Sequence, residues 1–178
     1  MRLNRGFTLF EALIVMAVAS VLACIAVPAF RNASAEAHGA SAKAAFVETW
    51  LAAVNHAALT GTEVVLCPGA PTGCRAVSDW SGGWIAYADL DGDRARAPGE
   101  TLLREIGPLG GGVRLHSTAG RTRLVFQPNG GNAGSNATFT LCDGRGAAAA
   151  TTLVMSNQGQ LRQGSPSPEA ATACALAP

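Results

Sequence analysis

An uncharged apolar run near the N-terminus constrains the fold of this chain more than any other feature. From Ala12 to Phe30 there is no Asp, Glu, Lys or Arg, and only Ser20 and Pro28 interrupt the apolar side chains. As a helix, these residues would span roughly 28 Å, about the thickness of the hydrocarbon core of a bilayer. A core helix of a soluble protein would show a polar face, and this run shows none. The sequence therefore predicts one membrane-spanning helix.

The flanks of the run leave two interpretations. Arg2 and Arg5 precede it, which favours an N-terminus held in the cytoplasm and a helix that stays in the membrane. An ordinary secretory signal is the alternative, because Ala-Val-Pro-Ala at 26–29 resembles a cleavage site.

The length of the chain predicts one domain, or one domain with an appendage. The chain has 178 residues, of which 48% are hydrophobic and 14% charged, so a disordered, highly charged chain is excluded. A net charge of +1 provides no global field that would mark a binder of nucleic acid or of membrane surfaces.

Glu11 lies at the edge of the apolar run, where a carboxylate is energetically unfavourable. It would cost about 2.5–3.5 kcal/mol at the bilayer centre, and less near an edge. The segment RGFTLFEALI at 5–14 resembles the class III signal of type IV prepilins and of type II secretion pseudopilins. The resemblance implies cleavage by prepilin peptidase between Gly6 and Phe7, and N-methylation of Phe7. Glu11 would then be the glutamate at the fifth mature position, which faces a neighbouring subunit's N-terminal amine during assembly.

Apolar residues return after the run at helical spacing, and Thr60-Gly61 supplies a helix stop. We expect one helix of about 50 residues whose second half lies under a globular head. The expected organisation is a leader peptide at 1–6, a transmembrane and filament-core helix at 7–30, an amphipathic continuation at 31–60, and a β-rich head with a Pro- and Ala-rich tail at 61–178. The residues expected to face the head are Ala40, Ala44, Val47, Leu51, Val54 and Ala58.

The period changes after Gly61 to short runs typical of strands, separated by turn residues. No crossover helices are visible, so the strands should be antiparallel and the fold class α+β. The predicted strands are Glu63–Cys67, Trp84–Asp89, Glu100–Ile106, Val113–Ser117, Arg123–Gln127, Thr138–Cys142, Thr151–Ser156 and Gln160–Arg162.

Five cysteines constrain the head. Cys24 lies in the apolar run and should behave as a small apolar residue, which leaves four cysteines and three pairings. Cys67 and Cys74 flank a six-residue turn, Cys142 and Cys174 are the other natural pair, and the sequence leaves the pairing open. Zinc is the competing interpretation, but there is no Cys-x-x-Cys and the three histidines are scattered. Disulfides are favoured, which places the head in an oxidising compartment.

The stretch from Val64 to Glu105 is similar to the GspH/FimT group of minor pilins and pseudopilins. The shared features are a cysteine pair, Asp79-Trp80, Gly83-Trp84, an acidic turn, Gly99-Glu100 and Leu102-Leu103-Arg104. The resemblance implies a pilin-like fold with Trp80 and Trp84 in the core of the head.

The acidic turn that starts at Asp89 places carboxylates at positions 1, 3, 5 and 12, as in a calcium-binding hand loop. Its glycine falls at position 4 instead of 6, and Pro98 interrupts where a helix should begin, so a solvated turn is favoured over a metal site. No catalytic motif or cofactor-binding loop is present. We therefore expect no metal, no cofactor and no enzymatic activity.

Some FimT-like proteins capture DNA through a Gly-Arg-x-Arg motif in the final strand. This chain has Gly-Gln-Leu-Arg there, ending at Arg162, and a literal match at 120–123 that leads into a different strand. Arg121 and Arg123 should share one face of that strand. With Arg145 and Arg162 they could contact phosphates if folding gathered them, although exposed arginines on a sheet are more often a solvated edge.

The sequence thus predicts a structural subunit of a filament, with a single-pass helix in the bacterial inner membrane and a periplasmic head before assembly. Its expected partners are prepilin peptidase and the major and other minor pilins or pseudopilins. Incorporation into a type IV pilus is the leading interpretation. A minor pseudopilin of type II secretion is the first alternative, and a DNA-binding minor pilin for natural transformation is the second.

Overall fold

The computed structural model describes residues 8–134 and 136–176. They fall into two compact units, 1–34 and 35–178, and the long helix α1 (Leu9–Thr60) contributes to both. The helix continues through Pro28. Its 52 residues agree with the expected length of about 50.

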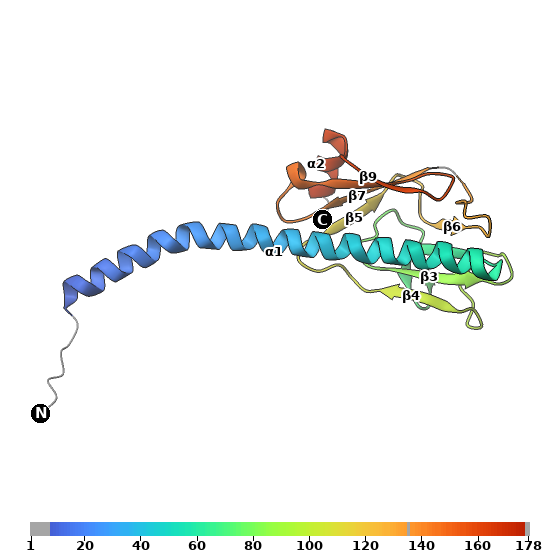
Figure 1. Ribbon diagram of the computed structural model, residues 1–178, viewed down its shortest axis with the longest axis horizontal. Helices are drawn as coiled ribbons and strands as arrows, with labels where there is room; N and C mark the ends of the chain where they lie inside the picture. Colours follow the sequence, from blue (N-terminus) through green and yellow to red (C-terminus); the bar gives the residue numbers. More distant parts are fainter. Residues whose placement is uncertain (1–7, 135, 177–178) are drawn as a thin grey trace, which may run out of the picture. The chain divides into compact units, whose positions relative to one another are not determined.

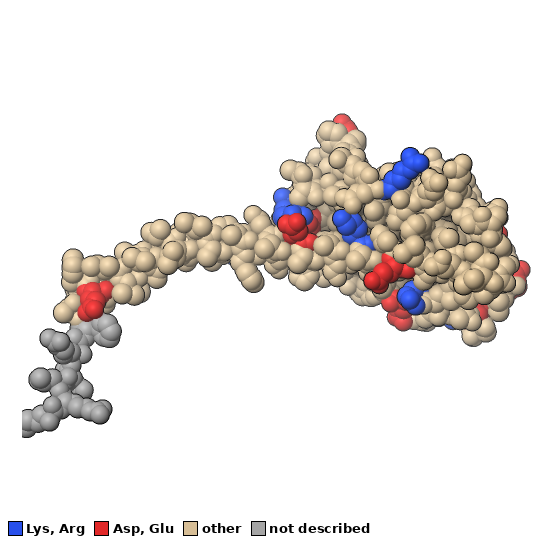
Figure 2. All heavy atoms as spheres, viewed as in Figure 1, with Lys and Arg blue, Asp and Glu red and all other residues tan. Residues whose placement is uncertain are grey.

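In the first unit, α1 presents its apolar side chains to the surroundings. Every large hydrophobic residue from Leu9 to Phe30 is exposed, from 47% for Val27 to 80% for Leu9. On the face shown in Figure 2, the helix carries acidic atoms at its start, and the apolar residues that follow carry no charge. By length and composition this helix can cross a membrane.

The second unit contains two antiparallel sheets, which confirms the predicted α+β class (Figure 1). The first sheet has the order β2-β1-β3-β4, and β6 also pairs with β1. The second sheet has the order β5-β7-β8-β9. The strands are β1 (Glu63–Ala70), β2 (Gly73–Cys74), β3 (Trp84–Asp89), β4 (Leu102–Ile106), β5 (Arg114–Ser117), β6 (Leu124–Phe126), β7 (Ala137–Cys142), β8 (Thr151–Met155) and β9 (Leu161–Gly164).

An aromatic cluster on α1 and both sheets forms the main core. Phe46 of α1 is fully buried, with its ring centroid 4.6 Å from that of Phe139 and 5.7 Å from that of Trp84. Trp80 and Trp84 are also fully buried, as expected of core residues. Trp84 donates from Nε1 to Oγ1 of Thr49 at 3.1 Å, so a buried polar group on the helix is paired with the sheet.

The helix packs on the head through a different stripe from the one predicted. The prediction was wrong for Ala40, Ala44, Leu51 and Ala58, which are exposed, because apolarity alone selected them. The other two predicted residues, Val47 and Val54, are half-buried, and Val54 packs against the main core. The buried stripe includes a glycine and a threonine, which permit close approach and a buried hydrogen bond. Its members are Gly39, Ala42, Phe46, Thr49, Ala53 and Ala57.

The opposite face of the first sheet is buried as well. Val65, Cys67, Ile85, Tyr87 and Val125 form a second cluster there. Because both faces are covered, all six residues of β3 are buried. Burial raises the pKa of Tyr87 to about 12, with the nearby Asp89 and Glu100 acting in the same direction.

Two disulfides close the head, Cys67–Cys74 and Cys142–Cys174. The first joins β1 to β2, and the second holds a C-terminal helix, α2 (Pro168–Leu176), against β7. A short helical turn, η1 (Ala147–Ala149), precedes β8. The sequence pattern did not predict α2, because its Pro- and Ala-rich composition resembles a tail.

Candidate functional site

The predicted processing site, Gly6 and Phe7, lies outside the described residues. The helix behind it begins with a cap, because Oγ1 of Thr8 accepts the backbone N–H of Glu11 at 3.2 Å. Glu11 therefore lies in the first turn of α1, where a carboxylate interacts favourably with the positive end of the helix dipole. The exposed carboxylate and the exposed apolar surface behind it form one continuous stretch of helix.

Arg145 belongs to an ionic cluster that joins the helix to the sheet. Its Nη1 lies 3.0 Å from Oε2 of Glu36, and its Nη2 lies 2.9 Å from Oδ2 of Asp143. Burial raises the pKa of Asp143, but the hydrogen bonds and the charge of Arg145 outweigh it and bring the pKa below its usual value. Arg145 is thus engaged within the head, which argues against the predicted role in contacting DNA.

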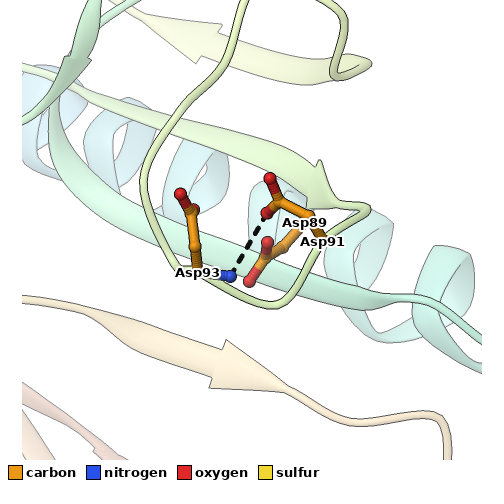
Figure 3. A group of neighbouring side chains, drawn as sticks. All are labelled: Asp89, Asp91 and Asp93. Carbon is orange, nitrogen blue, oxygen red and sulfur yellow. Dashed lines mark hydrogen bonds between the residues drawn. The ribbon is translucent and has the colours of Figure 1, made fainter.

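The acidic turn gathers three carboxylates, as Figure 3 shows. One ligand atom each from Asp89, Asp91 and Asp93 lies within 4.8 Å of the others. Each carboxylate also accepts backbone N–H groups of the same loop, including Gly92 to Asp89 at 3.0 Å and Asp93 to Asp91 at 3.2 Å. These bonds account for the carboxylates as loop-forming groups, in line with the expectation of a turn.

Buried Glu100 completes the loop by accepting the N–H groups of Leu90 at 3.0 Å and Ala97 at 2.8 Å. Burial raises the pKa of Asp89, and the charges of Glu100 and Asp91 act in the same direction against the backbone hydrogen bonds. The acidic side chains at the two ends of the loop therefore hold the intervening backbone in one shape.

Arg121 and Arg123 line one hollow together with Arg94 of the acidic loop. Arg121 and Arg123 both precede β6, because that strand begins at Leu124 and not at Arg123 as expected. Arg162 lies on β9 and lines a different hollow, where its Nη2 donates to Oε1 of Gln160 at 3.1 Å. Two of the four candidate arginines therefore lie together, and Arg145 and Arg162 each lie in other surroundings.

Sequence reasoning missed Arg94 and Arg96, which follow the acidic turn and line a neighbouring hollow together with Arg123. The available signal was the alternation in Asp-Arg-Ala-Arg at 93–96, which puts two arginines beside a loop already singled out for its carboxylates.

Two family models match the chain. Residues 46–159 match the model described as type II transport protein GspH, and residues 1–27 match the prokaryotic N-terminal methylation motif. The methylation motif implies processing by prepilin peptidase, and the family consists of structural subunits related to pilins.

The fold is similar to that of the type IV minor pilin FimU of Pseudomonas aeruginosa strain PAO1, solved in two crystal forms. One form has a TM-score of 0.50 and 17% identity, covering 75% of this chain and 91% of the crystallised FimU chain. The other has a TM-score of 0.51 and 16% identity, covering 75% and 87%. With the family model spanning more than half of its length, this chain belongs to the GspH/FimT family of type IV pilin-like proteins.

Proposed function

We propose that this protein is a minor pilin-like subunit of a type IV pilus, cleaved between Gly6 and Phe7 and N-methylated on Phe7. The observation that carries the proposal is the helix from Leu9 to Phe30, whose apolar side chains are exposed. Such a surface is stable in a membrane or against the helices of other subunits. A filament subunit occupies the membrane before assembly and contacts the helices of other subunits after it. The fold is similar to that of a type IV minor pilin, and the matching family model is described as a type II transport protein, so the choice between the two machines rests on the deletion strain described below.

The cleavage is tested by mass spectrometry of the N-terminal peptide from cells with and without prepilin peptidase. We expect a peptide that begins with methylated Phe7 in the presence of the peptidase, and an intact leader at 1–6 in its absence. An N-terminus produced after Ala29 would instead indicate an ordinary secretory signal and would contradict the proposal.

Glu11 is proposed to guide assembly by pairing with the N-terminal amine of a neighbouring subunit. A charge pair in an apolar filament core is expected to change incorporation by about tenfold or more. Glu11→Ala should therefore reduce the amount of this protein in sheared pili. Glu48→Ala, which removes an exposed glutamate from the same helix within the head, is the matched control. Equal incorporation of both variants would refute the role of Glu11.

A deletion strain distinguishes the pilus from type II secretion. The activity of secreted enzymes in the culture supernatant is compared between the deletion strain and its complemented control. We expect normal secretion and altered piliation. Enzymes retained in the periplasm would instead identify the protein as a minor pseudopilin.

The proposed location before assembly is the inner membrane, with the head in the periplasm. The two disulfides support an oxidising compartment for the head. The proposed role is structural, with other pilins as partners and with no enzymatic activity.

DNA binding is a second candidate, supported by the hollow that Arg94, Arg121 and Arg123 share. Replacing Arg121 and Arg123 together by Gln should weaken retention of the full-length protein on duplex DNA and reduce its salt dependence, since each phosphate contact releases counterions. Arg104→Gln, an exposed arginine on β4, is the control. Retention unaffected by the double variant would remove this candidate.

A further inference from the structure

An apolar groove lies where the second sheet meets α1. It has a volume of about 420 Å³ and is bordered by the helix on one side and by β8 and β9 on the other. We call it the β9 groove. The apolar side chains that line it are Ala40, Ala44, Val47, Trp50, Leu153 and Leu161.

One wall of the β9 groove is part of the stripe of α1 that the apolar pattern predicted to face the head. Ala40 and Ala44 are exposed, Val47 is half-buried, and all three line the groove. An apolar stripe at helical spacing is usually covered by a packing partner. The head covers this stripe only in part, so the groove offers apolar surface to a further segment.

The strand β9 leaves backbone groups free along its outer edge. It is the last strand of its sheet, and β8 is its pairing partner among the strands described. The N–H of Ser156 donates to the carbonyl of Gln160 at 2.9 Å, and the same register continues along β9 to Arg162. Bonded pairs alternate along an antiparallel ladder, so the N–H and C=O groups of Leu161 and Gln163 point away from β8. Such an edge accepts an extended segment as a further strand.

Two hydrogen bonds hold β9 in place beside the helix. Nε1 of Trp50 donates to the carbonyl of Gly159 at 3.2 Å, just before the strand begins. Nζ of Lys43 donates to Oε1 of Gln163 at 3.3 Å, near its end. The free edge and the apolar groove therefore lie side by side before any partner binds, which lowers the cost of ordering the site on binding.

The charges at the groove favour an acidic partner. Lys43 and Arg162 line it, with Glu48 as the acidic residue among the lining side chains. Arg162 donates to Oε1 of Gln160 at 3.1 Å, so both cations bond to a glutamine amide, and neither forms an ion pair with a described carboxylate. Side chains alternate along a strand, so Arg162 lies on the opposite face of β9 from Leu161 and Gln163.

We propose that an extended segment of another protein adds to β9 as a further strand, with apolar side chains in the groove and a carboxylate near Arg162. A helical partner would bond its own backbone and leave the edge groups of Leu161 and Gln163 unpaired. The proposal rests on the head alone, and its test does not depend on the assignment to a pilus.

The probe is an acetylated and amidated heptapeptide, Val-Thr-Val-Glu-Val-Thr-Val, titrated into the full-length protein in detergent. Tryptophan fluorescence reports binding, because Trp50 lines the groove whereas Trp80 and Trp84 are fully buried in the core. We expect a saturable change with the wild type, since pairing of main chains depends little on the sequence of the segment. Absence of saturable binding would overturn the proposal.

The matched variants are Gln163→Pro and Gln163→Ala. Proline removes the N–H that points to the free edge and leaves the bonds to β8 intact, so it should weaken binding about tenfold. Alanine loses the bond to Lys43 but keeps the N–H, and it should bind nearly as the wild type does. Equal affinities of the two variants would overturn the proposal. Their thermal unfolding midpoints show whether each variant is folded.

A second probe keeps the test decisive if Gln163→Pro does not fold. The same peptide with N-methyl groups on its three central residues keeps its side chains but loses backbone donors, and it should bind about tenfold more weakly. Equal binding of both peptides would indicate contact through side chains alone, as for a helix, and would contradict strand addition.

The carboxylate is tested with Arg162→Gln and with a peptide in which Gln replaces the Glu. The variant should weaken binding of the acidic peptide and leave binding of the neutral one unchanged. Arg104→Gln on β4 is the control for general charge effects. Equal weakening by Arg162→Gln and Arg104→Gln would refute a carboxylate near Arg162. An apparent affinity that falls as the protein concentration rises would mean that a second copy fills the groove, and it would overturn the choice of another protein.

Discussion

The two parts of α1 show how one helix can depend on two kinds of surroundings. From Leu9 to Phe30 its large apolar residues are exposed, whereas in the part that belongs to the head Phe46 is fully buried among aromatic rings. A helix in water derives most of its stability from packing. The first part must therefore obtain that packing from a membrane or from other subunits, and the second part obtains it from its own chain.

The strongest test of this comparison is the same substitution in both parts. Phe46→Ala should lower the free energy of unfolding of the head by about 3–5 kcal/mol, because it leaves a cavity among Trp80, Trp84 and Phe139. Phe10→Ala, at a residue 73% exposed, should change it by less than about 0.5 kcal/mol. Denaturant unfolding of the full-length protein in detergent, followed by tryptophan fluorescence, measures both, since all three tryptophans lie in the head. Similar losses for the two variants would mean that the helix unfolds as one body with the head.

The cysteines extend the comparison. Replacing Cys142 and Cys174 by Ser should lower the free energy of unfolding by about 3–4 kcal/mol, since their crosslink closes a loop with a sequence separation of 32. Replacing Cys67 and Cys74 should cost about 2–3 kcal/mol for a separation of 7.

Cys24→Ser is the control from the exposed part of α1 and should leave the unfolding of the head unchanged. The hydrogen bond from Nη1 of Arg114 to the carbonyl of Ala175, at 2.8 Å, also holds α2 on the sheet. Faster proteolysis near α2 in the Cys142 and Cys174 variant would accompany its lower stability. Unchanged stability of that variant would mean that contacts such as the hydrogen bond from Arg114 suffice to hold α2 on the sheet.

The sequence predicts most of this fold because its signals are local. The uncharged run, the helix stop at Gly61 and the alternating strands all depend on neighbours in the chain. The stripe of α1 that faces the head could not be predicted in this way. Gly39 and Thr49 are buried because of Asp143 and Trp84, which lie far away in the sequence.

The candidate site residues differ in the same way, because some follow from local sequence and others depend on tertiary contacts. Glu11 follows from a local motif, and Arg121 and Arg123 are close in sequence and line one hollow. The separation of Arg145 and Arg162 depends on tertiary contacts such as Glu36 with Arg145. The guanidinium of Arg96 lies over the ring of Tyr87, 5.9 Å from its centroid, and no spacing in the sequence reveals this contact.

Asp143 makes the attachment of the helix to the sheet sensitive to pH. Its pKa in the folded head lies below the ordinary value of 3.8, so its contribution to stability is complete above that pH and is lost as the pH falls through the folded-state pKa. Asp143→Asn should lower the free energy of unfolding near neutral pH by roughly 1–3 kcal/mol. It should also make that free energy fall less steeply as the pH is lowered into the acid range. Glu105→Gln, an exposed carboxylate on β4, is the control. An acid profile of Asp143→Asn parallel to that of the wild type would contradict this role.

The smallest expected effect concerns Gly39, where helix propensity and packing oppose each other. In an exposed helix, Gly→Ala stabilises by about 1 kcal/mol. Here an added Cβ would lie 2.8 Å from Oδ2 of Asp143, whose position is fixed by Arg145, so we expect Gly39→Ala to destabilise the head by about 1 kcal/mol. In an Asp143→Ala background the same change should become stabilising, because the close contact is gone and the propensity remains. Urea unfolding of the four proteins of this cycle measures the reversal. A stabilising effect of Gly39→Ala in both backgrounds would show that Asp143 moves aside freely. The part of α1 around Gly39 would then be held less tightly than its ionic contacts suggest.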